Sequence, residues 1–410
     1  MLQSLGLGKE ASILQVAQIV SSLSMGYGGP ARSAAALSEA LADLNCRVTL
    51  WAADMTSVCG PRVPVDRRRV TVRETPCLAW PRLRLFLPRR LLACLTEALR
   101  DSDVAHSHEL WQVLNHVAAE AAWRARVPHV ISTRGAVGGW ALRRSAWKKN
   151  LARRLYVERN IRRSACLHAL TPREAQDLRG FGVARPIAVI PNGVWLPEET
   201  EHLDDSPAVE ELKPELAGKR IVLFMGRLHP TKGLPLLLGA WSAVHQKFPE
   251  WHLVLAGPDE GRHAQDLRKM LRGAPSAGSV TFTGPVQGGR KRALFGAAGL
   301  FCLPSLTEGF SVAVLEALAW QCPVLITDRC NFDRVAEVQA GRVVPATAEG
   351  MRRGLTDLLS AGPDQLAAMG RRGYELVRHN YTWRSVAERM RRLYLWLVGG
   401  GHAPEFVLQP

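Results

Sequence analysis

The sequence predicts an α/β protein made of two doubly wound, Rossmann-like domains. Its 410 residues exceed the roughly 250 to 300 at which a single hydrophobic core stops growing, so two cores are expected. Short apolar stretches alternate with helical patterns along the chain, which is typical of parallel sheets covered by helices. Both halves open in a similar way, with an apolar strand that leads into a glycine-rich turn.

Strand positions and local composition set the expected domain boundaries. The N-terminal domain is predicted over 1–195, with its last strand at 188–194. The segment 196–219 is acidic and contains proline, a composition typical of linkers. The second domain is predicted over 220–379, and a final helix is expected over 380–398.

The first half opens with an apolar strand at 13–20, a glycine-rich loop at 25–30 and a helix over 31–44. Gly28 and Gly29 would let a donor phosphate or an acceptor approach the backbone at the helix N-terminus. The third glycine of a G-x-G-x-x-G fingerprint is missing, which makes a nicotinamide enzyme a poor fit. Alternatively, the two glycines simply form a loop.

Asp103 begins the next apolar strand, which is expected to end near His108 and Trp111. Ligands bind beyond the carboxyl ends of open parallel sheets, so His108 and Trp111 are candidate acceptor-side residues. His106 shares a face with His108, and a hydrogen-bonded core histidine is an equally good interpretation. Asp101 and Asp103 precede their strand instead of ending it, so we assign them no metal.

Arg134 ends the following apolar segment, just before a glycine. Its planar guanidinium binds oxyanions through two parallel hydrogen bonds, so Arg134 could grip an anionic acceptor such as a phosphate or a uronic acid. An ion pair with a neighbouring acid is the alternative.

The second half opens with an apolar strand that begins at Arg220 and leads to Gly226, Arg227, Lys232 and Gly233. An arginine fork and a flexible lysine can neutralise a diphosphate ester without a metal ion. The two glycines would let the backbone approach closely. Solvated loop charges are the alternative interpretation.

Glu308 and Glu316 lie eight residues apart, after a short buried strand at 300–304. We expect Glu308 in a turn at the N-terminus of a helix over 311–320, and Glu316 roughly 12 Å further along its axis. Unpaired amides at a helix start favour an anion such as a nucleotide diphosphate. These amides belong to Gly309, Phe310 and Ser311. Alternatively, the glutamates are a favourable charge at a helix start and an exposed charge on its surface.

Together the Gly-Arg-x-x-x-x-Lys-Gly and Glu-x7-Glu segments resemble those of the retaining glycosyltransferases of family four. The resemblance covers most of the chain and implies the GT-B fold, in which two Rossmann-like domains face a central crevice and the last helix crosses back to the N-terminal domain. It implies that Glu308 contacts the donor sugar, Glu316 the ribose and Val286 the base. The donor diphosphate is assigned to Gly226, Arg227, Lys232 and Gly233, with Arg227, Lys232 and Glu308 as the catalytic residues. The loop of Gly28 and Gly29 resembles the glycine pair that follows the family's first strand.

Arg134 departs from the family pattern, because many members place a histidine before that glycine. The Arg-Gly pair, followed by Trp140-Ala-Leu and Ala146-Trp-Lys-Lys, resembles a subgroup associated with bacterial exopolysaccharide synthesis. The resemblance therefore implies a saccharide or lipid-linked saccharide as the acceptor.

A formal net charge of +16 calls for an anionic partner or surface. Basic residues lie beside Trp, Phe and Leu in two stretches, which suits an anionic membrane surface. The first contains Arg82, Arg84, Arg89 and Arg90, and the second contains Arg143, Arg144, Lys148, Lys149, Arg153, Arg154, Arg159, Arg162 and Arg163. A solvated helix face is the alternative, and no motif supports binding to nucleic acid.

The remaining features favour a cytoplasmic enzyme at the membrane surface. The eight cysteines form no Cys-x-x-Cys pair, which suits reduced thiols and argues against structural zinc. No apolar run reaches the length of about 18 residues that a spanning helix needs, and the N-terminus lacks the pattern of a signal peptide.

The predicted activity is the transfer of a sugar from a nucleotide-diphosphate sugar to a saccharide or lipid-linked acceptor, with retention and without a cofactor or metal ion. One alternative is an epimerase or a glycogen-synthase-like polymerase on the same fold. Another is a non-enzymatic basic protein that binds membrane surfaces. The donor base, the sugar and the linkage stay open.

Overall fold

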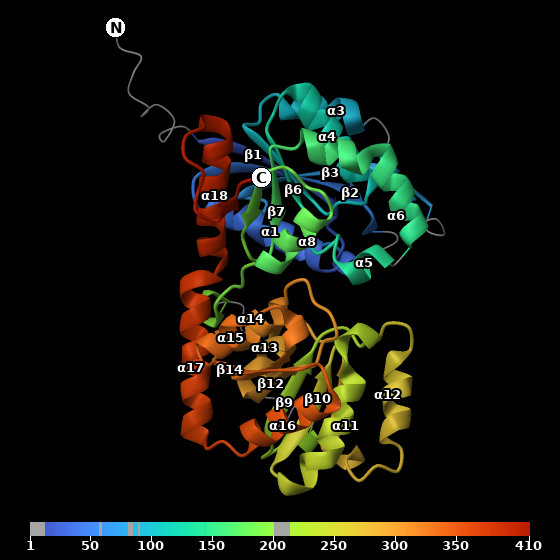
Figure 1. Ribbon diagram of the computed structural model, residues 1–410, viewed down its shortest axis with the longest axis vertical. Coiled ribbons are helices and arrows are strands. Elements are labelled where there is room, and N and C mark those ends of the chain that lie inside the picture. The colour runs from blue at the N-terminus through green and yellow to red at the C-terminus, as the bar shows by residue number, and fades with distance from the viewer. Residues whose placement is uncertain (1–12, 57–59, 81–84, 89–90, 144, 201–213) are drawn as a thin grey trace. The chain divides into compact units, whose positions relative to one another are not determined.

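The computed structural model describes residues 13–56, 60–80, 85–88, 91–143, 145–200 and 214–410, which form two compact units (Figure 1). The first unit comprises Met1–Gly193 with Trp383–Pro410, and the second comprises Val194–Thr382. Part of the predicted linker, 201–213, lies outside the described residues. None of the described helices combines the length and the apolar composition that crossing a membrane requires.

In the described part of the first unit, a nine-stranded sheet has the order β15-β8-β7-β6-β5-β1-β2-β3-β4. Neighbouring strands are parallel except at the two edges, where β15 pairs with β8 and β4 with β3 in antiparallel fashion. The strands are β1 (Leu14–Ser22), β2 (Cys46–Asp54), β3 (Val70–Trp80), β4 (Leu85–Pro88), β5 (Val104–His108), β6 (His129–Ser132), β7 (Cys166–Ala169), β8 (Ile187–Val189) and β15 (Val407–Leu408). The central strands β1 and β5 are almost wholly buried, as expected for a parallel sheet covered on both faces.

Helices cover both faces of this sheet. The C-terminal helix α18 packs beside α1, while α3 and α7 pack against α4 (Figure 1). The helical segments are η1 (Met25–Tyr27), α1 (Gly29–Ala42), α3 (Leu91–Leu99), α4 (Val113–Ala125), α5 (Gly139–Arg143), α6 (Ala146–Ala152), the π-helical turn η3 (Arg153–Val157), α7 (Glu158–Arg163), α8 (Pro172–Gly180) and α18 (Trp383–Gly399). Right-handed crossovers place α1 and α4 on opposite faces, because β2 and β6 lie on opposite sides of the β1–β5 pair.

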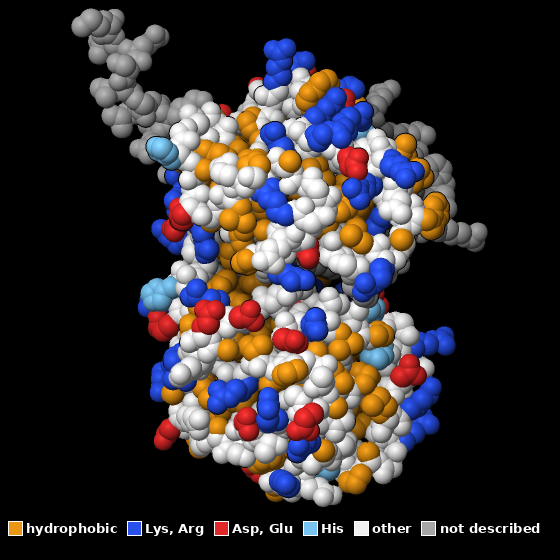
Figure 2. All heavy atoms as spheres, viewed as in Figure 1, with side chains coloured by type: hydrophobic (Ala, Val, Ile, Leu, Met, Phe, Trp, Pro, Cys, Tyr) orange, Lys and Arg blue, Asp and Glu red, His pale blue; other side chains and the backbone are white. Residues whose placement is uncertain are grey.

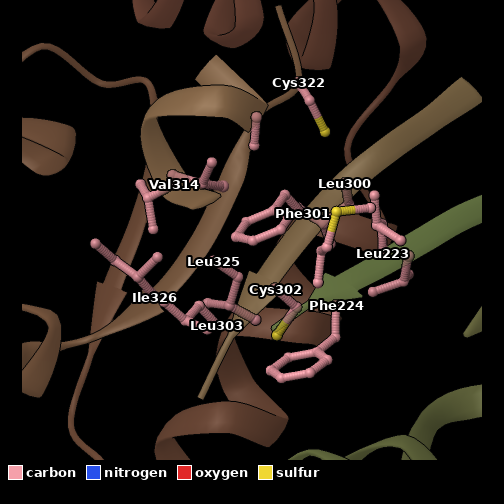
Figure 3. Packing of buried hydrophobic residues seen from close by; sticks show 14 of the residues in the cluster. Leu223, Phe224, Leu300, Phe301, Cys302, Leu303, Val314, Cys322, Leu325 and Ile326 are labelled. Carbon is pink, nitrogen blue, oxygen red and sulfur yellow. The ribbon is translucent and has the colours of Figure 1, made fainter. Parts of the chain in front are cut away.

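The described part of the second unit contains a six-stranded parallel sheet in the order β11-β10-β9-β12-β13-β14. The strands are β9 (Arg220–Met225), β10 (Trp251–Ala256), β11 (Val280–Gly284), β12 (Ala298–Leu303), β13 (Val324–Thr327) and β14 (Gly341–Val344). Figure 3 shows Leu223 and Phe224 of β9 beside residues 300–303 of β12, with Val314 of α14 over the sheet. These apolar runs form the core that fixes the strand ends.

Two groups of helices pack on this second sheet. One group consists of α11, α12 and α16, and the other pairs α14 with α17. The helical segments are α9 (Pro197–Thr200), η5 (Pro214–Leu216), η6 (Pro230–Lys232), α11 (Leu234–Val244), η7 (His245–Lys247), α12 (His263–Leu271), η8 (Ala277–Ser279), α13 (Gly288–Ala297), α14 (Val312–Ala319), η9 (Asp328–Cys330), α15 (Arg334–Glu337), α16 (Ala348–Leu359) and α17 (Pro363–Asn380). Two doubly wound α/β units are present, so the predicted fold class is confirmed.

Each sheet has a switch point where the strand order reverses. In the first unit it lies between β1 and β5, and in the second unit between β9 and β12. Ligands of such sheets bind beyond the carboxyl ends of the strands at this point. The loops that follow these four strands are therefore where a functional site is expected.

Candidate functional site

In the second unit, two predicted donor-binding segments meet beyond the switch point. Gly226 and Arg227 follow β9, and Glu308 lies in the loop that follows β12. The two loops touch, because the amide of Leu306 donates to the carbonyl oxygen of Thr231 at 2.8 Å. The parallel sheet thus brings together segments that are far apart in the sequence.

Gly233 makes this close approach possible. Its backbone adopts a φ of +66°, and a Cβ atom at this position would lie 1.9 Å from the carbonyl oxygen of Pro304. Any side chain would collide with rigid backbone there. The glycine that the sequence placed beside the two cations is therefore required by the contact between the loops.

Lys232 and Glu308 form an ion pair at the centre of this cluster. Their side chains are only 16% and 11% exposed, so solvent screens the pair weakly. Ser305 Oγ donates to the same carboxylate oxygen, Glu308 Oε1, at 2.7 Å. The other oxygen, Oε2, accepts no hydrogen bond from a described residue, which leaves it available to a sugar hydroxyl.

The helix after Glu308 begins later than the sequence suggested. α14 starts at Val312, one residue after the expected start, with Ser311 as an extended N-cap, and Glu308 lies in the preceding loop as expected. The backbone amides of Gly309, Phe310 and Ser311 donate to no described residue, and the Ser311 side chain does not cap the helix. Three unpaired amides before a helix N-terminus are suited to binding a phosphate group.

Aromatic packing holds the segment that carries these amides. The Phe310 ring lies 5.6 Å from that of Phe332 and 6.1 Å from that of Tyr381, measured between centroids. Val286, the predicted base contact, is partly buried against the core of the unit. The side chains of Phe310 and Val286 are apolar, so these residues can contact a donor only through apolar atoms or through their backbone.

Glu316 is paired with a lysine that sequence reasoning missed. Lys291 Nζ on α13 lies 2.5 Å from Glu316 Oε1, with side chains 29% and 23% exposed. The basic run at 290–292 was the available signal, but nothing in the sequence pointed to its contact with α14. The lysine fixes the orientation of the carboxylate predicted to bind the ribose.

Arg227 is placed differently from Lys232. Its Nη1 lies 2.5 Å from Glu260 Oε2, and its side chain is 58% exposed. The structure therefore places Arg227 on the exposed edge of the cluster and Lys232 within it.

In the first unit, Gly28 provides the turn into α1. It adopts φ 92° and ψ −143° as the N-cap residue, a conformation that favours glycine. Added Cβ atoms at Gly28 and Gly29 would meet nothing within 4 Å. Conformation, not crowding, accounts for Gly28, and the helix start beside it is open.

A directional chain of hydrogen bonds begins at Arg134 and runs beneath this switch point. Arginine only donates, so His108 Nδ1 must accept from Arg134 Nη2 at 2.8 Å. His108 Nε2 therefore carries the proton and donates to Gln18 Oε1 at 2.7 Å. The Gln18 amide then donates to the Tyr394 hydroxyl at 2.9 Å.

The chain continues from α18 across the strand ends. The Tyr394 hydroxyl donates to His106 Nδ1 at 2.6 Å, and His106 Nε2 donates to Ser132 Oγ at 2.6 Å. Ser132 donates to His168 Nδ1 at 2.5 Å, and His168 Nε2 donates to the Ile190 carbonyl oxygen at 2.7 Å. Because the chain starts at Arg134, which can only donate, and ends at the Ile190 carbonyl oxygen, which can only accept, the tautomer of each histidine in it is fixed. The Tyr394 hydroxyl connects α18 to the sheet.

This arrangement requires neutral histidines. Burial lowers the pKa of both His106 and His108 well below the ordinary value, and nearby histidine and Arg134 charges add to the shifts. Burial and the charge of Arg134 likewise lower the pKa of His168 to about 3. Burial also lowers the pKa of Arg134, to about 10, so the guanidinium stays charged at neutral pH.

At the end of this chain, hydrogen bonds to neutral groups hold the charge of Arg134. Arg134 adopts φ 54°, and its Nη1 donates to Asn192 Oδ1 at 2.5 Å. The Glu174 carboxylate accepts from Thr133 Oγ1 at 2.6 Å and from the Gly135 amide at 2.5 Å. Arg134 forms no ion pair with a described residue, and its buried Nε has no hydrogen-bond partner among them. Such a guanidinium is suited to an oxyanion.

The other two predicted acceptor-side residues serve this unit's structure. His108 is fully buried and uses both ring nitrogens, so it orients Arg134. Trp111 Nε1 donates to the Ala136 carbonyl oxygen at 3.0 Å, and its ring meets that of Phe181 edge-on at 6.2 Å. Sequence reasoning missed Gln18 and Tyr394, although a glutamine inside the apolar strand 14–22 was a usable signal.

Residues 146–163 of the second basic stretch form one continuous helical segment, α6–η3–α7. Trp147, Leu151 and Leu155 are 69%, 52% and 64% exposed and recur every four residues, so they form an apolar stripe. Lys148 and Arg154 lie beside the stripe and form no ion pair with a described residue. Figure 2 shows hydrophobic and basic side chains side by side at this surface. Arg144 and the first stretch, Arg82, Arg84, Arg89 and Arg90, lie outside the described residues or side chains.

Two parts of the chain match models of known families. Residues 28–193 match the family described as Glycosyl transferase 4-like domain, and residues 219–361 match the family Glycosyl transferases group 1. The fold resembles that of Anabaena Alr3699/HepE in complex with UDP, with a TM-score of 0.71 at 16% identity over 92% of this chain and 98% of that one. This likeness confirms the predicted fold.

Two curated relatives are similar in sequence. The chain is 33% identical over 217 residues to the phosphatidyl-myo-inositol mannosyltransferase of Mycolicibacterium smegmatis, a match that covers 52% of each protein. It is 27% identical over 315 residues to the D-inositol 3-phosphate glycosyltransferase of Jonesia denitrificans, over 73% of each. The first match therefore spans only about half the length of that relative.

Proposed function

Since the chain joins a glycosyl transferase 4-like domain to a glycosyl transferases group 1 domain, we propose that it transfers a sugar from a nucleoside diphosphate sugar to an acceptor hydroxyl, with retention of anomeric configuration. The observation that carries this proposal is the shielded Lys232–Glu308 pair beside the unpaired amides of residues 309–311. Cation and amides suit the diphosphate, and the free carboxylate oxygen suits the sugar.

The reaction needs only positioning and charge stabilisation from these residues. The bond between the anomeric carbon and the diphosphate oxygen breaks, and its electron pair leaves with the diphosphate. The acceptor oxygen bonds to the anomeric carbon on the same face, and its proton passes to the departing phosphate oxygen. Lys232 and the amides stabilise the negative charge that develops on the leaving group, with Arg227 at the edge. We propose that no metal ion takes part, so that EDTA leaves the rate unchanged.

The acceptor is proposed to carry a phosphate beside its hydroxyls. Arg134 offers a buried cation without an ion pair among the described residues. The names of both curated relatives contain an inositol phosphate, as the lipid phosphatidyl-myo-inositol in one and as D-inositol 3-phosphate in the other. Assembly of a bacterial surface or exopolysaccharide on a lipid-linked phosphate would supply an acceptor of the same class.

The test is a matrix of labelled donors and phosphorylated acceptors. UDP-glucose, GDP-mannose and ADP-glucose are incubated with D-inositol 3-phosphate, phosphatidylinositol vesicles or a polyprenyl diphosphate-linked saccharide. We expect one pair to give a labelled product, whose anomeric coupling by NMR shows retention. An epimerase would convert the donor without an acceptor, and a glycogen-synthase-like enzyme would extend an unphosphorylated glucan. Either result, or no turnover with any pair, contradicts the proposal.

We also propose that the chain docks on the cytoplasmic face of a membrane through Trp147, Leu151 and Leu155. An apolar stripe flanked by cations is typical of helices that lie in an anionic interface. In flotation assays we expect binding to phosphatidylglycerol vesicles and little binding to phosphatidylcholine vesicles. The triple alanine variant should lose this binding, whereas Met270→Ala, which removes an exposed side chain of the second unit, should keep it. Equal flotation of the two variants would contradict docking through this stripe.

A further inference from the structure

Glu109 follows β5 at the switch point of the first unit and has an unusual backbone. It adopts a φ of 82°, in a region that non-glycine residues rarely occupy. Its amide donates to the Ser132 carbonyl oxygen at 2.7 Å, and its own carbonyl oxygen accepts from Asn115 Nδ2 at 2.9 Å. The surrounding fold therefore holds a glutamate where glycine would be free of strain.

Its carboxylate is shielded and incompletely paired. The Tyr27 hydroxyl, from the turn before Gly28, donates to Glu109 Oε2 at 2.6 Å. Burial raises the pKa of Glu109, although the hydroxyls of Tyr27 and Ser21 and the charge of Arg134 oppose the shift. Glu109 forms no ion pair with a described residue. A carboxylate accepts about four hydrogen bonds, so the single bond from the Tyr27 hydroxyl leaves it with free capacity.

Arg134 follows the carboxyl end of the neighbouring strand. β5 and β6 pair in parallel, with His108 opposite Ser132. Each strand is followed, within two residues, by a charged side chain on a left-handed backbone, Glu109 in one case and Arg134 in the other. Strain of this kind persists where the surrounding structure enforces it, and it clusters at functional sites. Opposite charges at adjacent strand ends suit a ligand with both hydrogen-bond donors and an anionic group.

We propose that Glu109 determines acceptor specificity by accepting hydrogen bonds from the acceptor hydroxyls, while Arg134 binds the acceptor phosphate. An ionised carboxylate only accepts hydrogen bonds, so it attracts hydroxyls and repels a phosphate. The two residues thereby impose one orientation on a phosphorylated polyol. This inference rests on the proposed function and adds the residue that selects the acceptor.

The test compares Glu109→Gly and Glu109→Gln with the wild-type chain, using the donor and acceptor pair that the wild type turns over. Glu109→Gly should lower kcat/KM for the acceptor about 30-fold or more, since a hydrogen bond to a charged group is lost. Glu109→Gln keeps a carbonyl acceptor and should lower it about tenfold. Affinity for UDP or GDP by calorimetry should stay unchanged in both variants.

Stability separates this role from a structural one. Glycine adopts a φ of 82° without strain, so Glu109→Gly should melt no lower than the wild type. Arg126→Gly is the matched control, because Arg126 adopts φ 60° at the end of α4 in the same unit. It should be equally stable and fully active. The role of Glu109 would be overturned if Glu109→Gly left the acceptor kinetics unaltered, or if its loss of activity followed a lower melting temperature. Either result would leave the proposed function intact. A wild-type chain that neither binds nucleotide nor transfers sugar would overturn the proposed function as well.

Discussion

The two switch points hold their cations differently. In the second unit, each of three cations pairs with a glutamate, namely Arg227, Lys232 and Lys291. In the first unit, the cation Arg134 is held by hydrogen bonds to neutral groups. Two of the three pairs are partly shielded loop or helix contacts, and the third is exposed. Arg134 instead ends a buried chain of hydrogen bonds whose tautomers are fixed. A site for a diphosphate can thus be assembled from flexible charges, while the proposed acceptor site is built rigidly in advance.

The contrast predicts different responses to backbone change. Gly233→Ala should destabilise the second unit by more than about 4 kcal/mol, because its Cβ would meet the Pro304 carbonyl oxygen at 1.9 Å on a left-handed backbone. Gly28→Ala, with open space around its Cβ, should cost only about 1 to 2 kcal/mol of conformational strain. Urea unfolding of both variants measures the difference. Equal destabilisation would show that crowding does not distinguish the two switch points.

Burial should decide which donor-site cation matters more. Lys232→Ala should lower kcat/KM about 100-fold, because it removes charge from the leaving diphosphate and strands the shielded Glu308 carboxylate. Arg227→Ala should lower it only about tenfold, because that side chain is exposed and paired at the edge. Steady-state kinetics with the identified donor measure both. A larger loss for Arg227→Ala would mean that the diphosphate lies nearer the edge than the shielded pair.

The donor site of the second unit was easier to predict from the sequence than the proposed acceptor site of the first unit, and the reason is physical. Lys232 and Glu308 belong to short local segments, so strand, turn and helix signals placed them without knowledge of distant contacts. The chain from Arg134 to Ile190 draws on four strands and the C-terminal helix, and its partners follow from sheet order, which no local pattern encodes. The Lys291–Glu316 contact was not predicted for the same reason. Glu109 was not predicted, because nothing in the sequence indicates that this glutamate adopts a left-handed backbone conformation.

The buried histidines should make the first unit sensitive to mild acid. Burial lowers the pKa of His129 from about 6.5 to about 4, so between these values the unfolded chain binds the proton that the folded chain excludes. The contribution of neutral His129 to the free energy of unfolding is complete above pH 6.5 and is lost as the pH falls towards 4. His129→Gln should flatten the pH dependence of the unfolding free energy by up to about 1.4 kcal/mol per pH unit. Urea titrations between pH 5 and 7 measure this slope. An unaltered slope for His129→Gln would contradict the buried neutral state.

The smallest expected effect concerns Lys291, and it tests how loosely the donor site is assembled. Glu316→Ala should raise the donor KM about tenfold, and Glu308→Ala should instead mainly lower kcat, because one is proposed to bind the ribose and the other the reacting sugar. Lys291→Ala should raise the donor KM only about threefold, since this partly shielded pair merely orients Glu316. Because Lys291 acts through Glu316, the double variant should be no worse than Glu316→Ala alone. Additive losses would instead place Lys291 in direct contact with the nucleotide, and the donor site would then contain two shielded or half-shielded cations that bind phosphate.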